Sequence, residues 1–277
     1  MRAFSPAAGK IVSVEWNKSV AEVRSLLLPA AAHFVLPDLP GVVSDRDREA
    51  FETGTGDDPS SRIHTVAACH HETAESLLAA VDGVHPDARL LVVGGDQNRN
   101  QTTNPRCRGP SALSALDAAK ILSSERGNEL WGVADPNDPS SPERLLRKTE
   151  AGMAGFLTQP LLSSPASDTL ADCREAGGRA TKLLAGLALP RTARGLRFWA
   201  GLLGREDELE RDPLFASHLA YFSQPYVTPL AWAGRELTDL LGNPDADGVH
   251  FMPLSNTGDL CALFESLNHV RRAGSSE

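Results

Sequence analysis

Ionisable and amide side chains recur directly after the short apolar runs of this 277-residue chain. Where such runs form parallel strands, their carboxyl ends meet at one edge, so residues that follow them can share a site despite their separation in sequence. The residues at these positions are Glu15, Asp38, Cys69, His70, His71, Asp96, Gln97, Asp135, Gln159, Arg191, Ser255 and Asn256. Some of them will only cap loops or helices, and the others are candidates for proton transfer and ligand binding.

Glu15 is the clearest candidate for acid–base chemistry. It stands inside the apolar run Val-Ser-Val-Glu-Trp at 12–16, where an ionised carboxylate without a partner would be costly to bury. Its side chain must therefore face a polar cavity or form an ion pair in the core, for example with an arginine. In a cavity, the loss of water would raise the pKa of the carboxyl group and make Glu15 a general acid near neutral pH.

Other chemistries find less support. His70 and His71 adjoin Cys69, but adjacent side chains diverge on any regular element and no second histidine pair follows, so we expect no metal site. None of the five lysines follows a strand as a Schiff-base aldolase would require, and no glycine-rich phosphate loop occurs. The four cysteines lack a C-x-x-C pair, which indicates unpaired thiols rather than a zinc site or a disulfide framework.

These candidates need a scaffold, and the sequence predicts one. Eight runs rich in Val, Leu and Ile occur at 11–16, 33–36, 63–68, 90–93, 130–134, 155–158, 182–187 and 249–252. Segments with helical spacing of apolar residues occur at 72–81, 111–124, 142–151, 166–176 and 256–270. This alternation predicts an α/β fold, a single (β/α)8 TIM barrel over 1–270 with extra helices between strands seven and eight and a disordered tail at 271–277.

An open doubly wound sheet is the alternative architecture. It would need a Gly-x-Gly-x-x-Gly turn after an early strand. The segment Gly54-Thr55-Gly56 follows a helical stretch and lacks the third glycine.

The charge balance argues against a nucleic-acid partner, because 36 acidic against 27 basic residues give a formal net charge of -9. No signal peptide and no apolar stretch of about 18 residues occurs, so we expect a cytoplasmic protein without a membrane partner.

Short motifs, in order along the whole chain, resemble those of the methylenetetrahydrofolate reductase family. Arg-Lys-Thr-Glu-Ala-Gly at 147–152, followed by Thr158-Gln159, is similar to the family's Arg-Lys-x-Asp-Ala-Gly and Thr-Gln. Val-Glu-Trp at 14–16 occupies the place of its Phe-Glu-Phe-Phe-Pro-Pro, and Gly95-Asp96 matches its Gly-Asp. The segment 183–190 resembles its Ile-Pro-Gly-Ile-x-Pro strand, with Phe198 at the later aromatic position and Leu254 after the final strand.

The resemblance implies an oxidoreductase of one-carbon metabolism that reduces 5,10-methylenetetrahydrofolate to 5-methyltetrahydrofolate with NAD(P)H. Glu15 would protonate N10 of the folate, and Asp96 would bond the pterin edge and tune the hydride donor. Gln159, Phe198 and Leu254 would bind the folate, whereas Lys148, Gly95 and Asp135 would lie in the cofactor site. This assignment requires Glu15, Asp96 and Gln159 to converge at the mouth of the barrel.

Departures from the family pattern fall on positions that face the family cofactor, FAD. Gly94-Gly95-Asp96 replaces Arg-Gly-Asp, and Val-Ala-Ala-Cys at 66–69 replaces His-Leu-Thr-Cys. Ala-Asp-Pro-Asn-Asp-Pro at 134–139 replaces Ala-Tyr-Pro-Glu-x-His-Pro. Hydride transfer through FAD and direct transfer from NAD(P)H therefore both stay open. Two further alternatives are another one-carbon reaction in the same folate pocket and a catalytically silent protein that binds folate or a protein partner.

Overall fold

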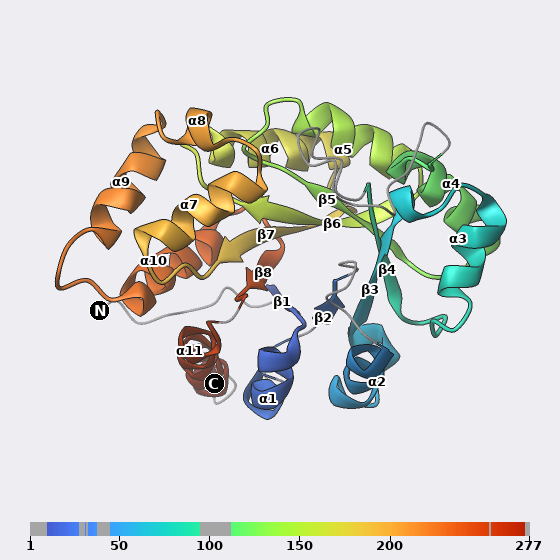
Figure 1. Cartoon of the computed structure of the whole chain (residues 1–277), viewed down its shortest axis with the longest axis horizontal. Helices are drawn as coiled ribbons and strands as arrows, with labels where there is room; N and C mark the ends of the chain where they lie inside the picture. The colour runs from blue at the N-terminus through green and yellow to red at the C-terminus, as the bar shows by residue number, and fades with distance from the viewer. Residues whose placement is uncertain are drawn as a thin grey trace.

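The computed structural model describes residues 10–27, 31, 33–37, 45–94, 112–254 and 256–274 (Figure 1). Within these ranges, eight parallel strands close into one barrel in the order of the sequence. They are β1 (Ile11–Glu15), β2 (His33–Leu36), β3 (Arg62–Ala67), β4 (Arg89–Val93), β5 (Leu130–Ala134), β6 (Met153–Pro160), β7 (Lys182–Ala188) and β8 (Gly248–Met252). The predicted (β/α)8 barrel is confirmed.

Helices surround the barrel. They are α1 (Lys18–Leu27), α2 (Asp45–Gly54), α3 (Ala74–Val81), α4 (Ala115–Glu125), α5 (Ser141–Glu150), α6 (Ala166–Gly177), α10 (Pro229–Gly242) and α11 (Thr257–Gly274), with single turns η1 (Pro59–Ser61) and η2 (Ala68–His70). Figure 1 shows α11, α1 and α2 along the side formed by β8, β1 and β2. Because α11 continues to Gly274, the first four residues of the predicted tail are helical, and 275–277 lie outside the described residues.

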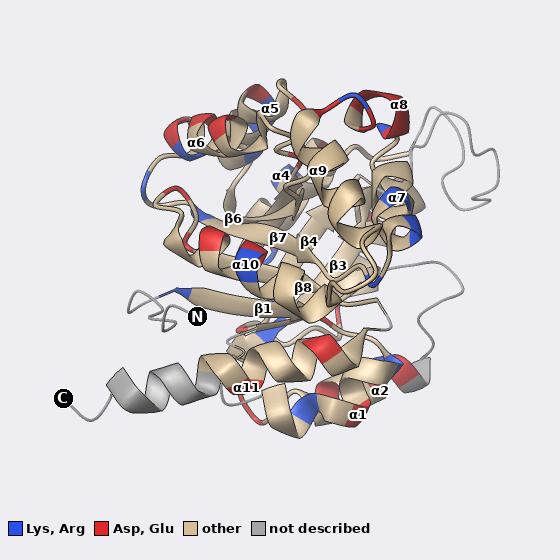
Figure 2. Cartoon of the chain, turned by 90° about the vertical axis from the view of Figure 1, so that its left-hand side faces the viewer, with Lys and Arg blue, Asp and Glu red and all other residues tan. Residues whose placement is uncertain are grey.

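The predicted extra helices between β7 and β8 are also confirmed. They are α7 (Ala193–Leu202), α8 (Glu206–Leu209) and α9 (Pro213–Phe222), which precede α10. Side chains of Thr192 and Asp212 accept backbone hydrogen bonds at the starts of α7 and α9, so local capping defines both helices. Figure 2 shows acidic and basic residues interspersed on the outer helices, with Glu206, Asp207 and Glu208 together on α8.

The core has two apolar layers. One lies between the strands and the helices, and the other fills the inside of the barrel with Val35, Ile63, Leu91, Trp131, Leu157 and Leu184. Trp131 requires a glycine opposite it, because a Cβ on Gly155 would approach its indole ring to 2.4 Å. This inner cluster is the floor on which the carboxyl ends of the strands build a site.

Cysteine chemistry differs from expectation at one position. Cys69 is disulfide-bonded, so the prediction of unpaired thiols is wrong for this residue, whose partner lies outside the described residues. Disulfide formation depends on distance in the fold, which the scattered sequence positions do not report. Cys173 and Cys261 are free.

None of the described helices combines the length and apolar character needed to cross a bilayer.

Candidate functional site

Side chains inside the barrel become polar toward the carboxyl ends of the strands. Glu15 pairs with Val35 in the β1–β2 ladder, and Val35 belongs to the inner apolar cluster, so Glu15 faces the inside of the barrel. Gln159 lies two residues beyond Leu157 of the same cluster, where the β6–β7 register shifts, and it lines a cavity at the ends of β5 and β6. The mouth of the barrel thus carries an acid from β1 and an amide from β6 above an apolar floor.

The Glu15 carboxyl group has no protein partner among the residues that the structure describes. Neither a hydrogen bond nor an ion pair joins it to any of them, which contradicts the alternative of an ion pair in the core. Burial alone raises the pKa of Glu15 to about 7. A carboxyl group with such a pKa, at the carboxyl end of a barrel strand, can donate a proton to a molecule bound beside it.

The buried histidine next to β1 supplies no positive charge to Glu15. On the neighbouring strand β8, His250 is buried and its Nδ1 lies 2.9 Å from Oγ of Ser13, two residues before Glu15. Burial lowers the pKa of His250 to about 3, so its imidazole is neutral at physiological pH. Since a neutral imidazole cannot stabilise a carboxylate by charge, the protonated form of Glu15 persists to higher pH. On β3, Thr65 also faces inward, and its Oγ1 atom, like the Glu15 carboxyl group, has no described hydrogen-bond partner.

A cavity of about 420 Å³ opens at the ends of β5 and β6. It is lined by Val133, Ala134, Asp135, Asp138, Ser141, Arg144, Leu145, Lys148, Gln159, Leu202, Leu203 and Arg205. Three residues predicted from the sequence, Gln159, Lys148 and Asp135, therefore lie around one cavity. Arg205 was not predicted, because its position between α7 and α8 bears no strand-end signal.

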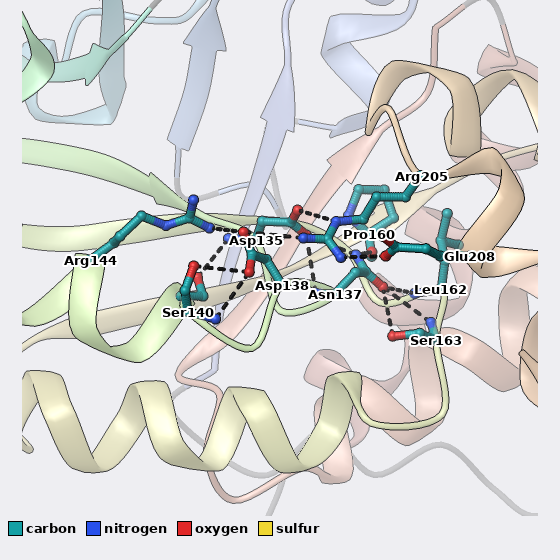
Figure 3. A network of polar contacts seen from close by, with 11 residues as sticks. Asp135, Asn137, Asp138, Ser140, Arg144, Pro160, Leu162, Ser163, Arg205 and Glu208 are labelled. Atoms are coloured by element: carbon teal, nitrogen blue, oxygen red, sulfur yellow. Dashed lines mark hydrogen bonds and ion pairs between the residues drawn. The ribbon is translucent and has the colours of Figure 1, made fainter. Parts of the chain in front are cut away.

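A network of polar contacts forms one wall of this cavity (Figure 3). The Asp135 Oδ1 atom accepts hydrogen bonds of 3.0 Å from both the backbone N–H and the side-chain amide of Asn137. Arg205 lies 3.7 Å from Asp135, 3.1 Å from Asp138 and 2.8 Å from Glu208. Figure 3 shows these charged groups directed toward one another, so the protein itself already satisfies the Asp135 carboxylate.

Lys148 presents an unbalanced positive charge to the same cavity. Its Nζ atom donates a 2.5 Å hydrogen bond to the backbone carbonyl of Val133, and no described carboxylate forms an ion pair with it. Burial, followed by the charge of Arg144, lowers the pKa of Lys148 to about 8. A buried cation of this kind can hold an anionic group such as a phosphate, which would restore its full charge.

The extra helices cover part of the mouth. Leu196 and Trp199 of α7 belong to one cluster with Ala188 and Met252, the last residues of β7 and β8. Phe198 lies on the other face of α7 with 50% of its surface exposed, and it does not line the cavity beside Gln159. Figure 1 shows α7, α9 and α10 gathered beside β7 and β8.

Leu254 follows β8 at the rim. Its φ angle of 50° is the sole positive value at a non-glycine position in the described ranges, and 43% of its surface is exposed. Such a conformation is strained for a leucine and persists only where the surroundings hold it.

Several predicted site residues cannot be placed. Asp38, Gly95, Asp96, Gln97 and Ser255 lie outside the described residues. Glu15 ends β1 and Gln159 lies near the end of β6, but Glu15 does not line the cavity beside Gln159. Convergence of Glu15, Asp96 and Gln159 on one pocket therefore stays a prediction. In the described ranges, no group of three or more His, Cys, Asp and Glu side chains could hold a metal ion.

Comparison with known proteins adds a likeness in fold. No family model and no curated protein sequence matches the chain. A solved structure from Clostridium thermocellum, described as an uncharacterized protein that binds two copies of 5-methyl-5,6,7,8-tetrahydrofolic acid, matches with a TM-score of 0.60. The match covers 95% of this chain and 96% of that one at 15% sequence identity. At this identity the two proteins share a fold.

Proposed function

We propose that this chain binds a reduced folate at the mouth of its barrel and reduces 5,10-methylenetetrahydrofolate to 5-methyltetrahydrofolate with NAD(P)H. The observation that carries the proposal is Glu15, an unpartnered carboxyl group that faces the mouth and titrates near neutral pH. The Clostridium thermocellum protein supports the choice of ligand, because it binds 5-methyltetrahydrofolate on a similar fold.

The proposed reaction begins with a proton. Neutral Glu15 would donate it to N10 of the folate, which opens the five-membered ring and leaves an electrophilic iminium carbon on N5. A hydride from the nicotinamide ring would then reach that carbon and convert it into the methyl group. One proton and one hydride are consumed, and Glu15 is left ionised until it takes a proton from water.

The other residues would bind and orient the reactants. The side-chain amide of Gln159 has no described hydrogen-bond partner and would be offered to the pterin. The exposed ring of Phe198 and the exposed side chain of Leu254 would contact the apolar parts of the folate. Gly95 and Asp96 keep the roles that the family resemblance implies, in the cofactor site and at the pterin edge respectively.

FAD fits the described residues poorly. Asp135, at a flavin-facing position of the family, is already bonded to Asn137 and paired with Arg205. Leu202 and Leu203 of the extra helical segment line the same cavity. Lys148, by contrast, would hold one phosphate of the diphosphate that NAD(P)H also carries. We therefore favour NAD(P)H as the direct hydride donor.

A folate-binding protein without reductase activity is the second candidate. The description of the Clostridium thermocellum protein, which mentions binding of a folate and no reaction, supports it equally. Folate binding alone needs no proton donor, so the raised pKa of Glu15 would then have no catalytic role.

Two measurements on purified protein distinguish the candidates. Calorimetry with 5-methyltetrahydrofolate tests binding, and oxidation of NADH and NADPH with 5,10-methylenetetrahydrofolate tests reduction. Binding together with oxidation of a nicotinamide cofactor supports the reductase. Binding without oxidation supports the second candidate, and an absence of folate binding contradicts both. An absorption spectrum without a flavin band in the active protein would support direct transfer.

A further inference from the structure

The end of β1 is anchored on its outer side by Trp16. This residue is 2% exposed and makes edge contacts with Phe34 and Phe51, each at 5.6 Å between ring centroids. Its backbone N–H donates to the Val35 carbonyl at 2.7 Å, which continues the extended ladder beyond Glu15. Because successive side chains of an extended chain point to opposite faces, Glu15 and Asn17 both lie on the side of the barrel mouth.

Asn17 connects three segments at this point. Its Nδ2 atom donates a 2.7 Å hydrogen bond to the backbone carbonyl of Leu254, in the loop after β8. Its Oδ1 atom accepts a 3.0 Å hydrogen bond from the backbone N–H of Val20, in the first turn of α1. One side chain thus caps α1 and also joins the ends of β1 and β8.

The loop that Asn17 holds is strained. Leu254 adopts a φ of 50°, a left-handed conformation that is unfavourable for a non-glycine residue. On the far side, Asn256 donates a 3.1 Å hydrogen bond to the Leu189 carbonyl after β7. The loop is therefore fixed from both neighbouring strands, with Leu254 at the rim beside the end of β1.

Charged and titratable groups occur on the elements next to β1. Among the side chains that the structure describes, they are Lys18, Glu22 and Arg24 of α1, His33 of β2, His250 of β8, and Asp259, Cys261 and Glu265 of α11. Asp259 accepts a 2.7 Å hydrogen bond from Asn256. None of them contributes to the shift at Glu15, for which burial is the cause. The ionisation of Glu15 therefore depends on how well the rim excludes water.

We propose that Asn17 is a positioning residue, which closes the rim beside Glu15 by tying Leu254 to the end of β1 and so keeps water away from the acid. The consequence of the Asn17–Leu254 bond for turnover rests on the proposed function. The effect of that bond on the ionisation of Glu15 needs no ligand and can be measured independently.

The substitution Asn17→Ser separates the two bonds of Asn17. A serine hydroxyl can still cap α1 but is too short to reach Leu254. Leu254→Gly opens the same rim differently, because it removes the leucine side chain from the rim, while glycine adopts the positive φ freely and retains the carbonyl that Asn17 binds. Asn243→Ala is the matched control, because Asn243 makes its 2.8 Å turn bond to the Asp245 N–H before β8, at the opposite end of the barrel.

Infrared titration of the carboxyl band, assigned by its loss in Glu15→Gln, gives the midpoint of Glu15 in each protein. We expect the midpoint to fall by about one pH unit or more, a tenfold change in proton affinity, in Asn17→Ser and Leu254→Gly. The control should keep the wild-type midpoint. A wild-type midpoint in either folded rim variant, or an equal fall in the control, would overturn the inference. Wild-type protein that binds no folate would contradict the proposed function and leave this titration valid.

Discussion

Arg205 lies 3.1 Å from Asp138 and thereby joins the helical segment between β7 and β8 to the loop after β5. This contact brings segments far apart in sequence together at the wall of the cavity that Gln159 and Lys148 also line (Figure 3). The barrel mouth is thus shaped by a helical insertion as well as by the strand ends. Its stability and its chemistry can be tested separately.

Loss of the Arg205 side chain should loosen this attachment. Arg205→Met leaves Asp135, about one-fifth exposed, without a cation, whereas Asp138 keeps its ion pair with Arg144. We expect the free energy of unfolding to fall by roughly 1–3 kcal/mol in urea denaturation. Arg197→Met is the control, because its ion pair with Glu210 is half-exposed and should contribute under about 1 kcal/mol. Equal losses in both variants would remove Arg205 from this role.

Lys148→Met should weaken binding of NAD(P)H. The methionine keeps the approximate volume and removes the charge proposed to hold a phosphate. We expect a rise in the dissociation constant of roughly 10- to 100-fold by calorimetry, since a hydrogen bond to a charged group contributes about 1.5–3 kcal/mol. Folate affinity should change little. Unaltered affinity for NAD(P)H would show that the phosphates bind elsewhere.

Stability should depend on Glu15 in a pH-dependent way. The folded-state pKa of about 7 lies above the ordinary value of 4.5, so the folded protein favours the neutral acid and loses stability as pH rises from 4.5 through 7. Glu15→Gln removes this loss. The variant should exceed the wild type by up to about 3 kcal/mol at pH 8 and match it near pH 4. Glu22→Gln, on the exposed side of α1, should show no such trend.

Apolar pattern predicted the barrel because buried parallel strands are nearly continuous apolar runs, and all eight were found. Two of the surrounding helices, α1 and α2, were not predicted. In α2 the sequence Asp-Arg-Asp-Arg-Glu-Ala-Phe-Glu-Thr-Gly offers a single large apolar residue, Phe51, which leaves no helical period to detect. The start of α4 was placed too early, although Ser114 and Asp117 form a capping box that the sequence contains.

The site was only partly predictable. Glu15 could be singled out because an acid inside an apolar run demands an explanation, and its inward orientation follows from strand alternation. Arg205 and Asn17 could not be identified, since their importance comes from neighbours brought together by the fold. Asp135 was expected in a cofactor site, which stays a prediction, and its carboxylate bonds to Asn137, a contact that residue type alone does not reveal.

The proposed role of Glu15 as the proton donor is tested most directly by the pH dependence of NAD(P)H oxidation in the presence of 5,10-methylenetetrahydrofolate. For the wild type we expect kcat/KM to fall about tenfold for each pH unit above about 7, as Glu15 ionises in the free protein. Glu15→Gln should still bind folate but lose about 100- to 10,000-fold in kcat at every pH. Glu236→Gln is the control. Burial raises the pKa of Glu236 to about 7 as well, but this residue lies on α10, so the variant should retain the wild-type profile. A Glu15→Gln variant that turns over at the wild-type rate would contradict the account.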